Sequence, residues 1–312
     1  VLTSDERLFL TDFRYVSQAQ EQVRDFERLP AGRELVSDLA PHLRGRAGFD
    51  DAHLTVRTHA RLAEEVAEGV ELVAAGGLVE GLREVKEEGE LDLMREAARL
   101  ATEALQRTLD GGLAGRTELQ VARELEQALR DGGAQEPSFP AIVAAGAHGA
   151  LPHAEPRDAE IPRGALVVID WGARVDGYCS DCTRTIATGP LDGRGEEVYE
   201  LVRSAQEASL AAVRAGAEKR AVDGVARSMI EEAGHGERFG HGLGHGVGLE
   251  VHEGPRLTKQ AEGELLTGNV VSVEPGVYLP GELGVRIEDL VAVTADGAEV
   301  LTSFSKQLTT VE

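Results

Sequence analysis

The chain has 312 residues, 42% of them hydrophobic, and its 55 acidic residues outnumber the 32 basic ones for a formal net charge of −23. This length suits one large domain and a small one, and the negative charge argues against nucleic-acid binding because it repels phosphate backbones. No apolar run approaches the roughly 20 residues of a membrane span, and the N-terminal sequence VLTSDERLFLTDF lacks the pattern of a signal peptide. We therefore expect a cytoplasmic protein with no membrane or nucleic-acid partner.

The first 85 residues are predicted to form a small α/β domain. Hydrophobic patterning predicts a β-α-α-β-α order, with a strand in LFLTDFRYV (8–16), helices over Ser17–Leu29 and Gly32–Leu43, a strand and turn at AGFDD (47–51), and a helix over Thr55–Ala67. The chain starts close to the first strand, which suggests that this module is shortened or lacks its first strands. The charged, glycine-containing segment REVKEEGE (83–90) marks the expected boundary, which we place between residues 85 and 86.

The remaining residues, 86–312, show one pattern twice. In each repeat two predicted helices precede a strand-rich stretch, first at 91–109, 117–130 and 139–188 and then at 196–215, 221–233 and 238–294. The second helix starts with a capping box, in which Thr117 is followed three residues later by Gln120, and DGG (131–133) ends it. The repetition indicates an internal duplication, with a shared sheet covered by helices.

An acidic hairpin is predicted in the first strand-rich stretch, ALVVIDWGARVDGYCSDCTRTIATG (165–189). Two apolar strands flank the turn-prone segment ARVDGY, and Asp170 and Asp181 are equidistant from a turn centred between Val175 and Asp176. Residues placed in this way face each other, with Cβ atoms about 5 Å apart. Buried carboxylates repel each other unless a cation lies between them, so this pair indicates a cation site.

The second strand-rich stretch repeats this arrangement in NVVSVEPGVYLPGELGVRIEDLVAVT (269–294). Glu274 and Glu288 are symmetric about Gly281, and their flanking segments are again apolar. If the two halves pack face to face, four carboxylates meet in one low-dielectric place, which requires more than one divalent ion. Hydrolases with two metals hold the ions about 3.5–4 Å apart, with a water or hydroxide between them.

Histidines supply a neutral ligand type. His241, His245 and His252 fall within HGLGHGVGLEVHEGP (241–255), where glycines allow close backbone approach and argue against a helix. His153, in the loop ALPHAEP before the first hairpin, is a further candidate. The other histidines have no such context and are interpreted as ordinary: His42, His53, His59, His148 and His235.

The two cysteines, Cys179 and Cys182, are too few for a disulfide framework. Their CSDC spacing superficially resembles a redox or metal pair, but in a strand residues i and i+3 point to opposite faces. We interpret them as partly buried residues that flank the more important Asp181.

Three motifs, IDWGARVDGYCSDCTRT, HGLGHGVGLEVHEGP and VEPGVY…GVRIED, resemble those of the pita-bread metallopeptidases, in the Xaa-Pro branch of aminopeptidase P and prolidase, small prokaryotic type. The resemblance covers residues 90–303. It implies an α/β (α+β) protein, with a C-terminal pita-bread (creatinase/aminopeptidase-like) catalytic domain of internal pseudo-symmetry and a shortened creatinase-like N-terminal domain. It also implies a homodimer.

The resemblance further implies roles for individual residues. The five metal ligands would be Asp170, Asp181, His245, Glu274 and Glu288. Of these, Asp181 and Glu288 would bridge two divalent ions, and Glu274 would also take the proton from a bridging water or hydroxide. The substrate site would contain His153, His241, His252 and Arg286, with His153 and His252 also acting in catalysis. An oxygen-rich site with one imidazole suits Mn²⁺, with Co²⁺ or Zn²⁺ as alternatives.

The predicted activity is therefore that of a metal-dependent exopeptidase that cleaves the bond between an N-terminal residue and proline in proline-containing peptides. An aminopeptidase P is favoured, because a shortened N-terminal domain should leave the cleft open, and a prolidase restricted to dipeptides is the alternative. A methionine aminopeptidase would not need the 85-residue module or the segment HGVGLEVHEGP. Metal-free enzymes of the creatinase type, or a peptide-binding relative without activity, should have lost ligands, and none is lost here.

Overall fold

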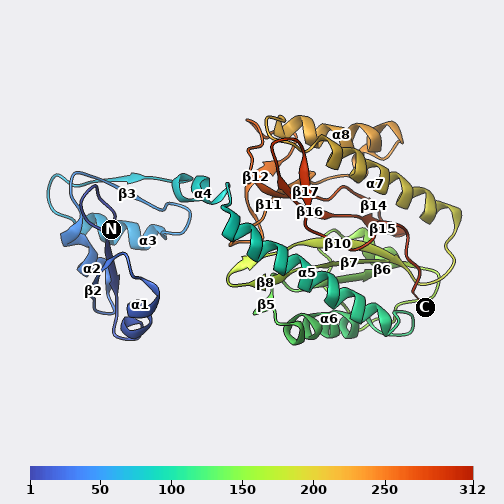
Figure 1. Cartoon of the computed structure of the whole chain (residues 1–312), viewed down its shortest axis with the longest axis horizontal. Helices are drawn as coiled ribbons and strands as arrows, with labels where there is room; N and C mark the ends of the chain where they lie inside the picture. The colour runs from blue at the N-terminus through green and yellow to red at the C-terminus, as the bar shows by residue number, and fades with distance from the viewer. Residues whose placement is uncertain (312) are drawn as a thin grey trace. The chain divides into compact units, whose positions relative to one another are not determined.

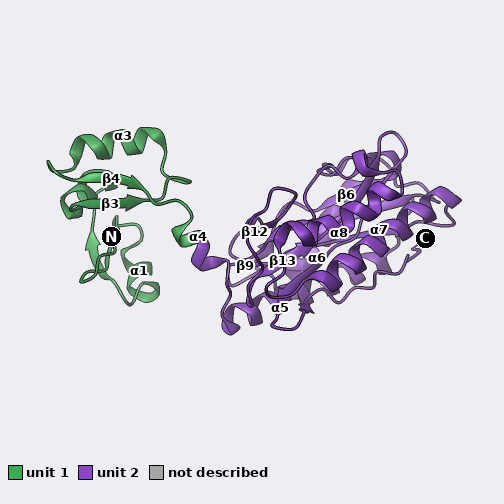
Figure 2. Cartoon of the chain, turned by 90° about the horizontal axis from the view of Figure 1, so that it is seen from above, with its two compact units in different colours: residues 1–80 green, residues 81–312 purple. Residues whose placement is uncertain are grey.

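The computed structural model describes residues 1–311, and the chain divides into two units, Val1–Glu80 and the residues from Gly81 onward (Figure 2). Each unit has its own secondary structure and is described separately below. The predicted boundary between residues 85 and 86 falls in the short connection between helices α4 (Leu78–Arg83) and α5 (Glu88–Asp110). Within residues 1–311 no helix is both long and apolar enough to cross a membrane.

The first unit contains two pairs of parallel strands, β1 with β2 and β3 with β4. Its elements in chain order are β1 (Leu8–Thr11), α1 (Val16–Gln22), β2 (Glu27–Pro30), α2 (Leu35–Leu39), the 3₁₀ turn η1 (Ala40–His42), β3 (Arg46–Phe49), α3 (Val56–Glu65), β4 (Glu71–Ala74) and the start of α4. The strands β2 and β4 were not predicted, and the helix expected over Ser17–Leu29 was wrong beyond Gln22. Local propensity is a weak guide here, because pairing with the apolar strand β1 outweighs the helix preference of Glu27 and Arg28.

The second unit contains two pairs of long helices, as the repeated pattern predicted. Figure 1 shows α5 and α6 on one side of the strands of this unit and α7 and α8 on the other, and the bounds beyond α5 are α6 (Glu118–Gly132), α7 (Gly193–Ala212) and α8 (Lys219–Glu232). The predicted capping box of α6 is confirmed, since the Gln120 backbone N–H donates to Thr117 Oγ1 at 3.2 Å and the Thr117 N–H donates to Gln120 Oε1 at 2.9 Å. Helix α5 starts earlier than predicted because Glu87 and Glu90 form a second capping box.

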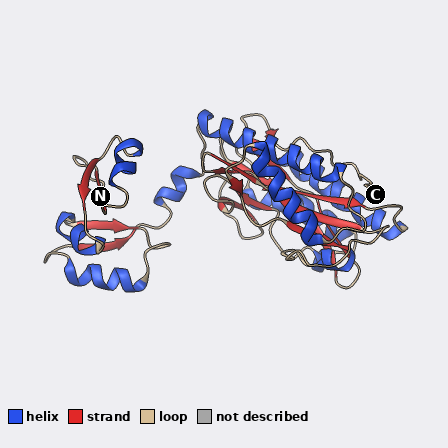
Figure 3. Cartoon of the chain, turned by 90° about the horizontal axis from the view of Figure 1, so that it is seen from below, coloured by secondary structure: helices blue, strands red, loops and turns tan. Residues whose placement is uncertain are grey.

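The strands of this unit, drawn in red in Figure 3, lie between the helix pairs labelled in Figure 1. Two short sheets, β10-β7-β6 and β5-β8-β9, contain β5 (Glu136–Pro137), β6 (Ile142–Ala145), β7 (Leu166–Trp171), β8 (Ala173–Val175), β9 (Tyr178–Cys179) and β10 (Cys182–Ala187). A sheet β12-β11-β13-β16-β17 and the pair β14-β15 contain β11 (Gly244–Gly246), β12 (Glu253–Leu257), β13 (Val270–Val273), β14 (Gly276–Leu279), β15 (Leu283–Arg286), β16 (Asp289–Val293) and β17 (Ala298–Val300). The 3₁₀ turns η2 (Gly146–Ala150) and η3 (Gly236–Arg238) connect elements.

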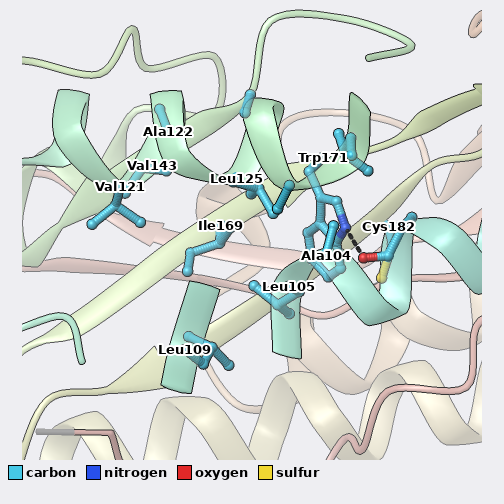
Figure 4. Close-up of a cluster of buried hydrophobic side chains, with 14 of the residues drawn as sticks. Ala104, Leu105, Leu109, Val121, Ala122, Leu125, Val143, Ile169, Trp171 and Cys182 are labelled. Carbon is cyan, nitrogen blue, oxygen red and sulfur yellow. Dashed lines mark hydrogen bonds between the residues drawn. The ribbon is translucent and has the colours of Figure 1, made fainter. Parts of the chain in front are cut away.

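Each helix pair packs on strands to form a hydrophobic core. One cluster joins α5 and α6 to β6 and β7, and Figure 4 shows Leu105, Leu125, Ile169 and Trp171 converging in it. The indole N–H of Trp171 donates to the Ala101 carbonyl at 2.7 Å, so its polar atom is satisfied. A second cluster joins α7 and α8 to β13, β14, β15 and β16. The helix pairs thus hold the strand ends that carry the acidic residues.

The Glu274–Glu288 hairpin has the predicted register. Val273 pairs with Asp289 and Gly276 with Arg286, and Gly281 adopts a positive φ of 79° in the connecting turn. The symmetry about Gly281 is therefore confirmed. Both glutamates lie in the short breaks between consecutive strands.

The predicted register of the Asp170–Asp181 hairpin is wrong. Asp170 pairs with Thr183, and the turn is centred between Asp176 and Gly177, whose φ angles are 45° and 87°. A two-residue hairpin turn with positive φ at both positions favours Asp-Gly, and this choice moves the centre by one residue. Asp181 consequently lies between β9 and β10 rather than directly across from Asp170.

Candidate active site

All nine predicted site residues line a single cavity of about 380 Å³, namely Asp170, Asp181, His245, Glu274, Glu288, His153, His241, His252 and Arg286. Apolar residues that include Phe139, Ile142 and Val251 complete its wall. Segments distant in the sequence therefore converge at one place, as the sequence predicted. The cysteines take no part in the lining and are buried free thiols.

Three carboxylates form the centre of the cavity. Ligand oxygens of Asp170, Asp181 and Glu288 lie within 4.8 Å of one another. Within the described residues, Asp170 Oδ1 and Glu288 Oε1 are buried without any hydrogen-bond partner. Buried acceptors are normally satisfied, so these two oxygens indicate a missing electropositive partner.

The fourth carboxylate is paired with a histidine. His245 Nε2 lies 3.2 Å from Glu274 Oε1 and 3.6 Å from Asp181 Oδ2, so the imidazole connects the two acids. The Ser272 hydroxyl donates to Glu274 Oε1 at 2.9 Å and accepts the backbone N–H of His245 at 3.0 Å. Ser272 in β13 thereby fixes the carboxylate of Glu274 and the backbone of His245.

Burial and mutual repulsion raise the pKa of three of the four carboxylates, and for Asp170 the ion pair with Arg286 opposes this effect without cancelling it. Burial, reinforced by neighbouring carboxylates, raises the pKa of Asp181 and of Glu288 well above its ordinary value. Burial also acts to raise the pKa of Glu274, but the hydrogen bond to His245 and the positive charges of His245, His241 and Arg286 together outweigh burial and lower this pKa to about 2. The pKa of His245 is raised, because Glu274 overcomes the opposing effect of burial. Additional positive charge near Asp181 and Glu288 would therefore favour their ionised forms.

The side chains fit divalent metal ions. Carboxylate oxygens with one imidazole form a donor set that suits ions such as Mn²⁺, and a cation would satisfy the two orphaned oxygens of Asp170 and Glu288. It would also relieve the repulsion that raises the pKa values of Asp181 and Glu288.

Arg286 and Tyr278 form a polar wall beside this centre. The Arg286 guanidinium donates to Asp170 Oδ2 at 2.6 Å and to the Tyr278 hydroxyl at 2.9 Å, and it is almost fully buried. The Tyr278 oxygen lies 2.9 Å from His241 Nε2. Tyr278 was missed by sequence reasoning although it stands in the motif VEPGVY, because an aromatic residue in a strand ordinarily indicates core packing.

Two of the predicted substrate-site histidines are neutral near pH 7. Burial lowers the pKa of His241, and burial together with the neighbouring His245 lowers the pKa of His252 to about 4. The His252 ring packs edge-on to the His245 ring, with centroids 4.4 Å apart. A neutral imidazole keeps one N–H to donate and one nitrogen to accept, which is what a group that contacts a carbonyl oxygen requires.

Two family descriptions match this chain. Residues 1–85 match the Creatinase/Prolidase N-terminal domain, and residues 92–295 match Metallopeptidase family M24. The second match covers more than half of the sequence and contains every residue of the cavity described above. The chain belongs to metallopeptidase family M24.

Relatives of this M24 peptidase agree in sequence and in structure. An uncharacterised peptidase of Bacillus subtilis is 39% identical over 99% of this chain and 88% of its own length. The structure of an Xaa-Pro dipeptidase from Bacillus anthracis superimposes with a TM-score of 0.96 at 39% identity, covering 99% of this chain and 88% of that one. An X-Pro aminopeptidase from Thermotoga maritima gives 0.91 at 35% identity, covering 99% and 89%. The resemblance stated from the motifs and the predicted fold class are both confirmed.

Three buried acids outside the cavity hold the segments that carry its histidines, namely Glu118, Asp223 and Glu253. None of the three was predicted from the sequence. On α6, Glu118 accepts the backbone N–H groups of Ala145 at 2.9 Å and Arg157 at 3.0 Å, and it lies 2.9 Å from Nδ1 of His148. The segment between these contacts contains His153. His148, interpreted as ordinary from the sequence, is thus buried as part of this anchor.

Asp223 on α8 acts in the same way on the segment of His241. Its carboxylate accepts the Leu243 backbone N–H at 3.0 Å and forms an ion pair with Arg227 at 2.7 Å. Arg227 in turn donates to the His241 carbonyl at 2.8 Å. An acid in an amphipathic helix usually faces solvent, so only the packed structure distinguishes such anchors from surface residues.

Proposed function

We propose that this M24 peptidase is a metal-dependent Xaa-Pro dipeptidase that hydrolyses the bond between an N-terminal residue and a C-terminal proline. The convergence of five ligand-type side chains in one cavity, with two orphaned buried oxygens, carries the proposal. Asp170, Asp181, His245, Glu274 and Glu288 are the residues that would hold two divalent ions, most simply Mn²⁺. Asp181 and Glu288 would be the ligands shared by both ions, as the resemblance of the motifs implies, and positive charge there would oppose the effects that raise their pKa values.

Divalent ions at such a centre would activate a water molecule and polarise the scissile carbonyl. The remaining chemistry belongs to the side chains of this chain. Glu274, whose pKa is lowered to about 2, is ionised and can accept the proton of the attacking water. His252 is neutral and can donate its N–H to the carbonyl oxygen as negative charge develops there. His153 lines the same cavity and is proposed to share this role.

The polar wall formed by Arg286 and Tyr278 would orient the substrate. The hydrogen bonds that join His241, Tyr278 and Arg286 fix their polar atoms relative to one another. Such fixed groups reduce the entropy lost when the substrate is aligned. Proline at the second position lacks an amide N–H and has a restricted φ, so a shaped cavity can select it.

Arg256 favours a dipeptide over a longer peptide. Its side chain lines the cavity, is exposed, and forms no hydrogen bond or ion pair with any other residue in the described part of the chain. A free guanidinium there can bind the C-terminal carboxylate that only a dipeptide presents next to the scissile bond. The likeness to the Bacillus anthracis dipeptidase supports the same choice, whereas the likeness to the Thermotoga maritima aminopeptidase keeps aminopeptidase P as the second candidate.

Substrate length separates the two candidates. Mn²⁺-loaded enzyme is assayed with Xaa-Pro dipeptides and with the matching Xaa-Pro-Yaa tripeptides. We expect kcat/KM to be at least about tenfold higher for the dipeptides, because a hydrogen bond to a charged group contributes about 1.5–3 kcal/mol. Faster cleavage of tripeptides would assign the aminopeptidase activity instead, and no cleavage of either would reject both.

The variant Arg256→Met tests the reason for this preference. It should raise KM for dipeptides about tenfold and leave any tripeptide cleavage nearly unchanged, since only the dipeptide carboxylate loses its partner. Arg238→Met, which changes an arginine outside this cavity, serves as the matched control and should behave as wild type.

A further inference from the structure

The segment that leads from α4 into α5 carries two cations that meet one buried acid of β12. Lys86 Nζ donates to Glu253 Oε1 at 2.7 Å, and Arg83 Nη2 donates to Glu253 Oε2 at 2.5 Å. The side chains of Lys86 and Glu253 are 1% and 5% exposed. One carboxylate thus holds two cations that lie about 170 residues away in the sequence.

The same segment is tied to its surroundings through the backbone. The Lys86 N–H donates to the Gly268 carbonyl at 2.8 Å, and Asn269 Nδ2 donates to the Glu84 carbonyl at 2.9 Å. A Cβ at position 254 would come within 2.1 Å of Glu84 Oε1, so the Glu84 side chain packs directly against Gly254. Lys86 therefore presents its ammonium group to Glu253 from a fixed backbone.

Glu253 directly follows His252 and organises the loop before it. Its Oε2 accepts the Glu250 backbone N–H at 3.3 Å, and Arg83 closes the same loop through Glu250 Oε1 at 3.3 Å. The Glu253 carboxylate also occupies the space that a Cβ at Gly248 would need. The loop that ends in His252 is therefore folded around the Glu253 side chain.

Stability alone is a poor reason for this arrangement. A buried ion pair is often no more stabilising than apolar residues of the same volume, and burial lowers the pKa of Lys86 against the raising effect of Glu253. The two ion pairs instead fix the orientation of the Glu253 carboxylate, because a carboxylate with two cationic donors has one well-defined orientation. That orientation sets the backbone at the neighbouring His252, whose ring packs on His245.

We propose that Lys86 and Arg83 are positioning residues that act through Glu253 to hold His252 in place for the reaction. This inference rests on the proposed hydrolysis of Xaa-Pro bonds, in which His252 contacts the scissile carbonyl. It makes the segment between α4 and α5 part of the support of the catalytic site, not only a connection between units.

The test combines Lys86→Met and Glu253→Gln with His252→Ala in the full-length, Mn²⁺-loaded protein. With Gly-Pro as substrate, each positioning variant should lower kcat at least tenfold with little change in KM and metal content, because a misplacement of about 1 Å can cost on the order of 10²-fold. In the His252→Ala background the same substitutions should cost less than about twofold, since residues acting through one group are not additive. Full additivity, or an unchanged kcat in the single variants, would overturn the proposal.

The matched control is Glu299→Gln, which removes a long-range bidentate ion pair with Arg95 (2.8 and 2.9 Å) outside the cavity. It should leave kcat and KM as in wild type.

If Lys86→Met does not fold, Arg83→Met takes its place, because the Arg83 side chain is 21% exposed and its loss leaves the Lys86–Glu253 pair intact. For this milder variant we expect a fall in kcat of about threefold to tenfold, again absent in the His252→Ala background, and an unchanged kcat would reject the role of Arg83.

A readout independent of activity separates this inference from the proposed function. The rate at which diethyl pyrocarbonate modifies His252, followed by peptide mass spectrometry, should change at least threefold in Lys86→Met and not in Glu299→Gln. If wild-type enzyme cleaves no Xaa-Pro peptide but this rate changes, the proposed function fails and the positioning of His252 stands. An unchanged rate rejects the positioning, whatever the substrate.

Discussion

The two acidic hairpins bring two carboxylates each to the cavity by different backbone routes. In each hairpin one register runs through both strand pairs, and in the Glu274–Glu288 hairpin both acids lie in breaks of the strands. In the other hairpin Asp170 belongs to β7, whereas Asp181 lies in the connection between β9 and β10. The local geometry therefore differs between the two halves of the duplicated unit.

Their charge patterns nevertheless match in part, although burial raises the pKa of Asp170 whereas the pKa of Glu274 is lowered to about 2. Each hairpin has one acid with a cationic partner, Asp170 with Arg286 at 2.6 Å and Glu274 with His245 at 3.2 Å. Each also has one acid, Asp181 or Glu288, whose pKa is raised well above its ordinary value by burial and by other carboxylates. The comparison indicates that function constrains the placement of charge more strongly than the path of the backbone, and four predictions test this.

The largest effect is expected from removing Asp181 or Glu288, the two acids whose pKa values are raised well above their ordinary values. Asp181→Ala and Glu288→Ala should each abolish peptide cleavage and reduce bound metal, because each would remove a shared ligand. The fold should survive, since a buried charge without a strong partner does not stabilise the protein. Peptidase assays, metal analysis and circular dichroism measure these effects, and normal turnover in either variant would refute the proposed metal centre.

The histidines should separate into two classes. His245→Ala should lower metal content, because this imidazole pairs with the Glu274 hairpin and reaches Asp181. His252→Ala and His153→Ala should keep both metals and lower kcat by about 10²–10³-fold, as expected for donors to the transition state. Equal metal loss in all three variants would show that the distinction between ligands and substrate-site residues is wrong.

Metal removal should make stability depend on pH. The folded pKa values of Asp181 and Glu288 are raised, so their ionisation destabilises the metal-free fold above the unfolded values of about 4. The raised pKa of His245 acts in the same direction, since its stabilisation is present at low pH and is lost as the pH rises through that pKa. Glu274, with a pKa of about 2, is ionised throughout pH 5–8 in the folded state and adds little dependence there.

Thermal unfolding with EDTA and with excess Mn²⁺ measures this effect. The metal-free protein should be less stable at pH 8 than at pH 5, and Mn²⁺ should raise the melting temperature more at pH 8. A melting temperature that does not respond to Mn²⁺ at pH 8 would mean that the four acids share no metal site.

The smallest effect is expected at the hairpin turns. Gly177 and Gly281 have φ angles of 87° and 79°, and an alanine in this left-handed region costs about 1–2 kcal/mol. Gly177→Ala and Gly281→Ala should therefore lower the free energy of unfolding by similar amounts, measured in urea. A larger loss of activity in Gly281→Ala would show that turn distortion affects Glu274 and Glu288, which face each other across their hairpin, more strongly than Asp170 and Asp181, which do not. Gly69→Ala, at a φ of 89° in the first unit, is the control for backbone strain at a residue that does not line the cavity.

The sequence by itself determined the long helices, the types of the site residues and the register of the Glu274–Glu288 hairpin. Amphipathic spacing and the Thr117 capping box are local, and the symmetry about Gly281 needs only the backbone freedom of one residue. Convergence of the acids and histidines was also predictable, because like charges in apolar strands imply a shared cation.

Only the tertiary structure decided the features that depend on distant partners. The strands β2 and β4 exist because β1 and β3 pair with them. The Asp170–Asp181 register, by contrast, follows a local signal that the apolar pattern did not reveal, the Asp176-Gly177 turn with its two positive φ angles. Burial of Glu118, Asp223 and Glu253 depends on donors supplied by other segments. An acid on an exposed helix and an acid that anchors a catalytic loop have the same local sequence signal, and they differ only in what the rest of the chain packs against them.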